Sequence, residues 1–259
     1  MLSIYIVINI VQTAFLITAR LKSKRLPKKI ILEVNNKPLI VHMINRIKHA
    51  KKINRIILCT STNKQDDPLI KIALKERIDF YRGSENDVLQ RLLKASKKFK
   101  LNHFANITAD IPMIDPFIID KSIEEYFKIK PDLLIPEAYS LGACLVVNVA
   151  SLEKVCLTKM KKNTEIWVKF FQSHNDFYIH TMKLNNESKN KNLKTSLDYA
   201  EDYAFIKKIF KELYKKNRIF KNKDIIDLIK KKPEISMINS NPKHLLRWKN
   251  HINKVTKKS

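Results

Sequence analysis

Short apolar runs alternate with stretches of helical periodicity over the first half of this chain of 259 residues. The runs end in small polar or charged residues, and the stretches between them place apolar side chains three and four positions apart. We expect strands over 14–18, 55–60, 79–81 and 103–108, and helices over 38–47, 68–76, 87–99 and 118–127. Such alternation is typical of a mostly parallel sheet flanked by helices, so the sequence predicts an α/β fold.

The carboxyl ends of these strands are the first place to look for function. In open parallel sheets, ligands bind beyond the carboxyl ends of the strands. The segments that follow the expected strands are 19–29, 60–66, 82–87 and 109–115.

The pattern weakens from about residue 131. We expect further strands over 133–135, 144–147 and 177–182, and a helix over 202–210. Residues 211–259 are strongly basic and contain short amphipathic stretches, which predict a helical tail packed on, or appended to, the same domain. The predicted organisation is therefore an N-terminal extension (1–12), a domain (13–210) and this tail (211–259).

The first nineteen residues contain no charged side chain and are mostly apolar. Their length is near the lower limit for a membrane-spanning helix. Polar residues interrupt the segment, and it has neither a charged amino-terminal region nor a signal-peptide cleavage pattern. We favour an extension followed by a buried strand over 14–18, and a membrane anchor remains the alternative.

Two features of the composition exclude several kinds of site. The chain contains only two glycines, which excludes glycine-rich phosphate-binding loops such as G-x-G-x-x-G and the P-loop. Its cysteines, Cys59, Cys144 and Cys156, are odd in number and widely spaced, so they form neither a disulfide framework nor a zinc motif. This favours a reducing compartment, and we expect a cytoplasmic location.

The chain has 51 Lys+Arg against 25 Asp+Glu, a formal charge of +26. Such a charge is compatible with binding of nucleic acid or small anions. The excess is spread along the chain, which indicates a solvated surface. A nucleic-acid-binding protein acting through residues 211–259 is an alternative, but that segment has no helix-turn-helix, zinc-finger or RRM signature, so we expect no nucleic-acid partner.

One group of cations is concentrated. The loop 20–29 holds six cations in ten residues and directly follows the first expected strand. Arg20, Arg25 and Lys29 would then converge where a polyphosphate binds, because arginine forks and lysine ammonium groups both engage phosphate oxygens. The alternative is an ordinary solvated basic loop.

Carboxylates follow the same logic. Asp110 comes at the end of a buried strand, where a hard oxygen ligand suits Mg²⁺ better than it suits packing. Asp115, just before Pro116, fits a helix cap instead. Asp198 begins an acidic stretch with Glu201 and Asp202 that either supplies a ligand or simply complements a helix dipole.

Several ordered motifs together resemble one family. They are ITAR-x-x-S-x-RLP-x-K (17–29), N-K-PLI-x-H-x-I-x-R (36–46), TSTN-x-x-DD (60–67), FYRGSENDVLQR (80–91), ITADIPMIDP (107–116) and SLDYAEDYAFI (196–206). Over about residues 14–235 the chain resembles the acylneuraminate and 3-deoxy-octulosonate cytidylyltransferases, particularly the branch linked to spore-coat polysaccharide biosynthesis.

The resemblance implies a nucleotide-diphospho-sugar transferase-like, Rossmann-like fold. It also implies transfer of CMP from CTP to a sugar acid of nonulosonic or octulosonic type, with release of pyrophosphate, for assembly of a surface polysaccharide. Mg²⁺ is the implied cofactor, and CTP, the sugar acid and a second copy of the chain are the implied partners.

The family's functional positions match residues of this chain. Those of the triphosphate loop match Arg20, Ser23, Arg25 and Lys29, and those of the metal site match Asp110 and Asp198. The strand end beside the base matches Thr60, Ser61 and Thr62, and the segment that contacts nucleotide or sugar includes Gly83 and Ser84. Lys29, Arg25 and Asp110 are the implied catalytic residues.

Three positions depart from the family pattern. Lys22 replaces a small residue, and Lys28 and Ala109 replace glycines, which allow close approach of the backbone to phosphate. Either the backbone here stays in ordinary φ/ψ space, or phosphate binding is weakened. A member with weakened or lost catalysis is therefore an alternative to an active enzyme.

Overall fold

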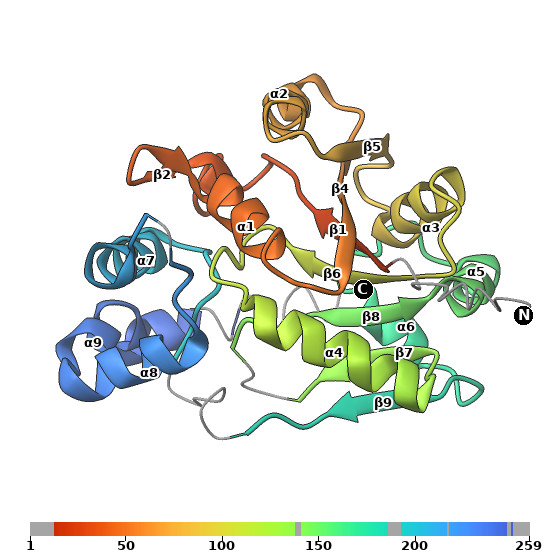
Figure 1. Cartoon of the computed structure of the whole chain (residues 1–259). Helices are drawn as coiled ribbons and strands as arrows, with labels where there is room; N and C mark the ends of the chain where they lie inside the picture. Colours follow the sequence, from red (N-terminus) through yellow and green to blue (C-terminus); the bar gives the residue numbers. More distant parts are fainter. Residues whose placement is uncertain (1–12, 138–140, 186–192, 217, 248–249, 251–259) are drawn as a thin grey trace, which may run out of the picture.

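The computed structural model describes residues 13–137, 141–185, 193–216, 218–247 and 250, and its centre is a sheet in the order β5-β4-β1-β6-β8-β7-β9 (Figure 1). The strands are β1 (Thr13–Thr18), β4 (Ile53–Ser61), β5 (Asp79–Gly83), β6 (His103–Thr108), β7 (Leu133–Pro136), β8 (Leu145–Asn148) and β9 (Ile179–Met182). β1, β4, β5 and β6 are parallel, whereas β8 runs antiparallel to β6 and β7. The expected mostly parallel α/β fold is confirmed.

Helices cover both faces of this sheet. They are α1 (Leu39–Ile47), α2 (Asp67–Lys75), α3 (Val88–Lys98), α4 (Pro116–Ile129), α5 (Val149–Thr158) and α6 (Val168–Gln172). Phe15 and Ile17 of β1 pack in one core cluster with α1, α2 and α4, and Ala14 and Leu16 pack in a second cluster with α3, α5 and α6. Burial on both faces explains why β1 is a continuous apolar run.

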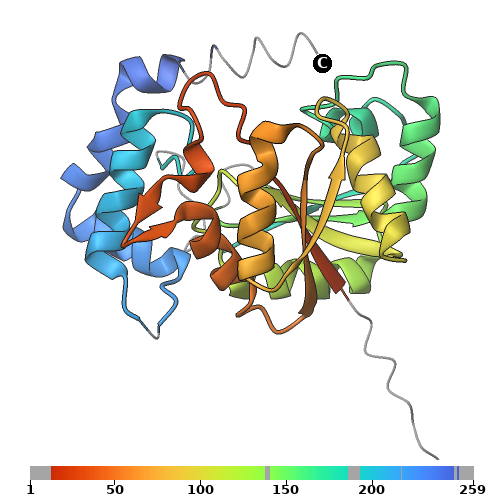
Figure 2. The ribbon, with the colours of Figure 1, turned by 90° about the horizontal axis from the view of Figure 1, so that it is seen from above.

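A third apolar cluster lies at one end of the sheet and is built by α7 (Ala200–Leu213), α8 (Asn222–Lys231) and α9 (Glu234–Ser240) (Figure 2). Phe205, Phe210, Ile225 and Ile235 are among its buried residues. The hairpin of β2 (Glu33–Val34) and β3 (Lys37–Pro38) contributes Val34. The described part of the basic tail therefore shares a core with the chain that precedes it, and the domain boundaries given above stay a prediction.

The structure adds elements that the sequence analysis did not anticipate. They are the β2–β3 hairpin, the helices α5 and α6, and the 3-10 turns η1 (Lys29–Ile31) and η2 (Lys64–Asp66). The strand expected over 14–18 is confirmed as part of β1, while the extension over 1–12 lies outside the described residues. None of the described helices is both long enough and apolar enough to cross a membrane.

Candidate active site

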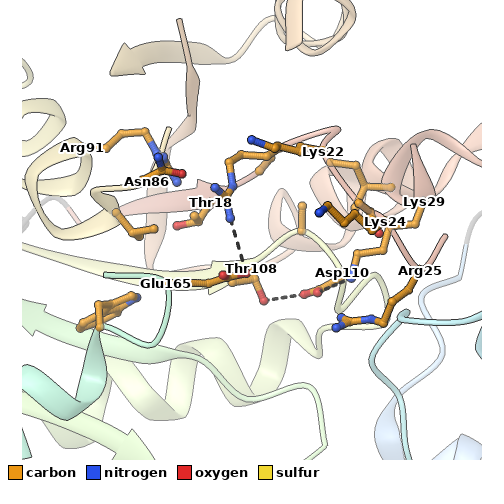
Figure 3. A pocket seen from close by; sticks show the side chains of 17 residues that line it. Thr18, Lys22, Lys24, Arg25, Lys29, Asn86, Arg91, Thr108, Asp110 and Glu165 are labelled. Atoms are coloured by element: carbon orange, nitrogen blue, oxygen red, sulfur yellow. Dashed lines mark hydrogen bonds and ion pairs between the residues drawn. The ribbon is translucent and has the colours of Figure 1, made fainter. Parts of the chain in front are cut away.

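A cavity of about 490 Å³ opens at the carboxyl ends of β1 and β6. Figure 3 shows Lys22, Lys24 and Lys29 of the loop after β1 above Asp110, with Arg25 beside it. The lining residues are Thr18, Ala19, Arg20, Lys22, Ser23, Lys24, Arg25, Lys29, Ile30, Asn86, Val88, Arg91, Thr108, Ala109, Asp110, Glu165 and Trp167.

The basic loop is held in place by the neighbouring strand. The Leu21 N–H donates to the Asp66 carboxylate at 2.7 Å, and the Ser61 hydroxyl donates to the other oxygen of that carboxylate at 2.5 Å. Asp66 and Ser61 are both fully buried. The end of β4 therefore fixes the start of the loop through one buried carboxylate.

Lys29 joins two carboxylates from distant parts of the chain. Its Nζ lies 2.8 Å from Asp110 Oδ2 and 3.1 Å from Asp198 Oδ1. Burial alone would lower the pKa of Lys29, but the Asp110 and Asp198 charges outweigh it, so the pKa is raised and the ammonium stays charged. Asp110 also accepts a hydrogen bond from the Thr108 hydroxyl.

Asp198 is the most heavily paired of these groups. Arg25 Nη2 lies 2.7 Å from its Oδ1, and Lys194 Nζ lies 3.1 Å from its Oδ2. Burial alone would raise the pKa of Asp198, but Lys29, Lys194 and Arg25 hold it far below its usual range. Asp198 is therefore an ionised carboxylate at neutral pH.

Asp110 and Asp198 have the chemistry of a magnesium site. Among the described residues no group of three or more His, Cys, Asp and Glu side chains could hold a metal ion by itself. Mg²⁺, however, typically binds through one or two carboxylates and completes its coordination with water and substrate phosphates. Two carboxylates that share one ammonium therefore fit Mg²⁺ together with a phosphate ligand.

The cavity brings together one part of the predicted site. Arg20, Ser23, Arg25, Lys29 and Asp110 line it, and Asp198 contacts Lys29 and Arg25. The residues predicted beside the base and sugar are not among the lining side chains; they are Thr60, Ser61, Thr62, Gly83 and Ser84. Thr60 and Ser61 are fully buried in β4, and the Thr62 N–H donates to the Gly83 carbonyl.

Other lining residues were missed by the sequence analysis. Arg91 is fully buried and donates to the carbonyls of Ser84 and Glu85, so it shapes the loop after β5. Arg20 Nη1 also donates to the Glu85 carbonyl, at 2.8 Å, and Arg20 Nη2 lies 3.5 Å from Glu165. Arg91 belongs to the 80–91 motif, so the sequence could have identified it as a site residue, whereas Glu165 lies in no motif.

The three departures from the family pattern have different structural consequences. Lys28 has φ 53° and ψ 26°, so the first of the two alternatives above, an ordinary backbone conformation, does not hold at this position. Lys22 forms an ion pair with Glu85 at 3.0 Å, and Ala109 is buried at the cavity wall. The loop therefore keeps a glycine-like conformation at Lys28 without a glycine.

Several known proteins are similar to this chain in sequence. The chain is 28% identical over 231 residues to an uncharacterized protein of Methanocaldococcus jannaschii, covering 87% of this chain and 93% of that one. It is 24% identical to the spore coat polysaccharide biosynthesis protein SpsF of Bacillus subtilis, covering 85% and 95%. It is also 31% identical over 117 residues to a 3-deoxy-manno-octulosonate cytidylyltransferase of Mesorhizobium japonicum, covering 44% and 48%.

The solved structure of a cytidylyltransferase from Leptospira borgpetersenii superposes with a TM-score of 0.79 at 26% identity, covering 86% of this chain and 96% of that one. The sequence profile of the cytidylyltransferases matches residues 14–232, which span every strand of the central sheet. The chain belongs to the cytidylyltransferase family, enzymes that transfer CMP from CTP.

Proposed function

We propose that this enzyme transfers CMP from CTP to the hydroxyl of a sugar acid, of nonulosonic or octulosonic type, in the assembly of a surface polysaccharide. The observation that carries this proposal is the arrangement around Lys29. Its ammonium group joins the carboxylates of Asp110 and Asp198 in a cavity that Arg20 and Arg25 also line. Cations for a triphosphate and carboxylates for a metal thus meet at one place.

The reaction is an in-line displacement at phosphorus. The acceptor hydroxyl attacks the α-phosphorus, the bond to the bridging oxygen of the β-phosphate breaks, pyrophosphate leaves, and the hydroxyl proton passes to solvent. In this scheme Arg20, Ser23, Arg25 and Lys29 bind the triphosphate, and Arg25 and Lys29 stabilise charge on the leaving pyrophosphate. The protein's main contribution is position and charge.

Asp110 and Asp198 would hold Mg²⁺. When bound, the ion would neutralise phosphate charge and lower the pKa of the attacking hydroxyl. Lys29 and Arg25 would then exchange their carboxylate partners for phosphate oxygens, because the triphosphate brings its own negative charge into the cavity. Thr60, Ser61, Thr62, Gly83 and Ser84 are proposed to contact the cytidine from the neighbouring strand ends.

The proposal of a sugar acid rests on the family motifs and on the relative named as a 3-deoxy-manno-octulosonate cytidylyltransferase. The test is a panel of sugar acids, neutral sugars and sugar phosphates incubated with CTP and Mg²⁺, with pyrophosphate release as the readout. Release that depends on a sugar acid supports the proposal. Equal release with a neutral sugar would contradict the acceptor assignment and leave the cytidylyltransferase activity in place.

The metal assignment has its own test. We expect Asp110→Asn to lower turnover by at least about a hundredfold, because removing one preorganised charge from a polar active site has an effect of that order. Asp120→Asn is the matched control, since Asp120 caps the Lys51 and Lys52 N–H groups far from the cavity lining. Turnover of Asp110→Asn equal to that of the control would overturn the assignment.

A homodimer is also proposed, and light scattering on the purified protein measures it.

A further inference from the structure

Asp202 is a fully buried carboxylate beside the proposed metal ligand, and the scheme above gives it no role. Its Oδ2 accepts hydrogen bonds from Lys194 Nζ at 2.5 Å and from the backbone N–H groups of Asp198 and Tyr199, both at 2.9 Å. It therefore binds directly to the short segment that carries Asp198.

Lys194 strengthens this connection. Its ammonium group lies between the two carboxylates, at 2.5 Å from Asp202 and 3.1 Å from Asp198. Two contacts thus connect Asp198 to Asp202: the hydrogen bond from the Asp198 backbone N–H, and the ammonium group of Lys194 that both carboxylates share.

The other oxygen of Asp202 is held by the C-terminal part of the chain. Its Oδ1 lies 3.1 Å from Asn239 Nδ2 in α9 and 3.0 Å from His244 Nε2. Asn239 also donates to the Lys194 carbonyl at 2.9 Å. Asn239 and His244 are almost completely buried.

A second contact joins the same two regions. The guanidinium of Arg247 lies 4.1 Å from the ring centroid of Tyr199, and that of Arg25, from the phosphate loop, lies 5.4 Å from it. Arg247 also pairs with Glu201 at 2.7 Å. One aromatic ring thus connects the C-terminal segment with a proposed triphosphate ligand.

We propose that Asn239 and His244 are positioning residues for the active site: through Asp202 they hold Asp198 in the orientation that a metal–nucleotide complex requires. This inference rests on the proposed role of Asp198 as a metal ligand. Mutation of the residues that orient a metal-binding carboxylate typically lowers metal affinity or activity by a factor of about 10 to 100.

The chemistry of the network favours positioning over simple attachment. Packing alone is already supplied here by apolar side chains such as Ile235, which α9 contributes to the third cluster. A buried carboxylate with several cationic and amide partners adds little stability over apolar packing but fixes one geometry. Asp202 and its partners lie next to Asp198, whose geometry would matter for catalysis if Asp198 binds the metal.

The test compares His244→Leu, which removes the hydrogen bond to Asp202, with His244→Gln, whose side-chain amide restores a donor. Binding of Mn²⁺ in the presence of CTP and without acceptor is followed by electron paramagnetic resonance, and kcat and the KM for CTP are measured with Mg²⁺. We expect His244→Leu to weaken Mn²⁺ binding about tenfold and His244→Gln to recover most of it.

Ile235→Ala is the matched control, because it removes buried packing from α9 and an isoleucine side chain makes no hydrogen bond to Asp202. It should lower the melting temperature and leave Mn²⁺ affinity unchanged below that temperature. Arg247→Ala, whose side chain is 49% exposed, is the second variant should His244→Leu fail to fold. It should weaken Mn²⁺ binding about threefold, less than the tenfold typical of directly bonded partners.

Two outcomes separate this inference from the function on which it rests. If His244→Leu and Arg247→Ala bind Mn²⁺ with CTP as tightly as the unmodified enzyme does, while Asp198→Asn does not, the positioning role is wrong and the metal site stands. If Asp198→Asn itself binds normally, the metal assignment fails, and this inference fails with it.

Discussion

Lys28 adopts a left-handed backbone conformation immediately before Lys29, the residue that joins the carboxylates of Asp110 and Asp198. A side chain in this conformation costs about 1–2 kcal/mol relative to glycine. Five more residues of the described chain with positive φ are not glycine either, namely Asn35, Asn36, Arg77, Lys100 and Lys130. The chain thus tolerates its shortage of glycine by placing long or amide side chains in conformations that favour glycine.

We expect Lys28→Gly to stabilise the protein by about 1 kcal/mol, because it removes the Cβ from a left-handed position. Urea denaturation followed by circular dichroism measures the change. The control is Lys24→Gly, an exposed lysine of the same loop that is not among the residues of positive φ, where glycine should destabilise. A Lys28→Gly protein less stable than the unmodified one would show that the lysine side chain itself holds the loop.

Lys29 occupies the two carboxylates that are proposed to bind the metal. Without nucleotide, its ammonium forms ion pairs with both Asp110 and Asp198, and Arg25 forms a further ion pair with Asp198. A divalent cation entering alone would have to displace these groups, whereas a triphosphate gives them a new partner. Metal and CTP should therefore bind together more tightly than the metal binds alone.

Lys29→Ala should consequently bind Mn²⁺ in the absence of CTP at least about tenfold more tightly than the unmodified enzyme. The reason is that removing a nearby cation makes the free energy of metal binding more favourable by more than about 1.4 kcal/mol. Its turnover should fall, because the triphosphate loses a ligand. Lys24→Ala, which removes another cavity lysine outside this ion-pair group, is the control. Weaker Mn²⁺ binding by Lys29→Ala than by this control would contradict the view that Lys29 and the metal compete for the two carboxylates.

Among the elements, the strands around the site were the most predictable. β1, β4 and β6 place buried residues in the core clusters on both faces of the sheet, and all three were predicted, so the sequence located the basic loop and Asp110 at neighbouring strand ends. The direction of β8 was not predictable, because four apolar residues look the same in either direction. The β2–β3 hairpin was missed since its strands are two residues long.

The far wall of the cavity could not be read from the sequence for a different reason. Glu165 and Trp167 reach it because the segment before α6 docks on the start of α3: Thr164 Oγ1 accepts from the Leu89 N–H and donates to Asp87. That contact spans more than seventy residues and leaves no local pattern. Arg91, by contrast, lies within a recognisable motif, and only its burial was unexpected.

Asp115 shows how one cap joins several elements. Its Oδ1 accepts from the Phe117 N–H at the start of α4, which confirms the helix cap expected from the sequence, and its Oδ2 accepts from the Asn222 N–H at the start of α8. Its own N–H donates to the Gly142 carbonyl. A Cβ on Gly142 would lie 2.7 Å from the Asp115 nitrogen, so this glycine is required by close approach as well as by its φ of 57°.

We expect Asp115→Ala to destabilise the protein by about 3 kcal/mol, because it removes a helix cap and leaves a second buried N–H without its acceptor. Asp115→Asn keeps one acceptor oxygen, so its loss of unfolding free energy should be about half as large. Equilibrium unfolding in urea measures both. Equal losses in the two variants would indicate that the charge of Asp115, rather than its hydrogen bonds, stabilises this junction.

For the whole molecule, the third apolar cluster joins the region after β1 to the C-terminal helices. Leu26 and Leu32 of the region after β1 pack against the cluster built by α7, α8 and α9. The same helices carry Asp202, which accepts a hydrogen bond from the Asp198 N–H, and Asn239, which donates to Asp202. The basic C-terminal region is thus connected to the active site by packing as well as by hydrogen bonds.

A chain ending at Leu213 should therefore fail to give a stable folded enzyme. Without α8 and α9 the buried residues Phe205, Ile209 and Phe210 lose their cover, and exposing each large apolar side chain costs about 1.5–3 kcal/mol. The measurements are soluble yield, gel filtration and thermal melting followed by near-ultraviolet circular dichroism. A chain ending at Arg247 is the control, because it keeps all three helices and the contacts to Asp202. If the shorter chain melts at the same temperature as this control, α8 and α9 are an appendage, and the enzyme's core is complete without them.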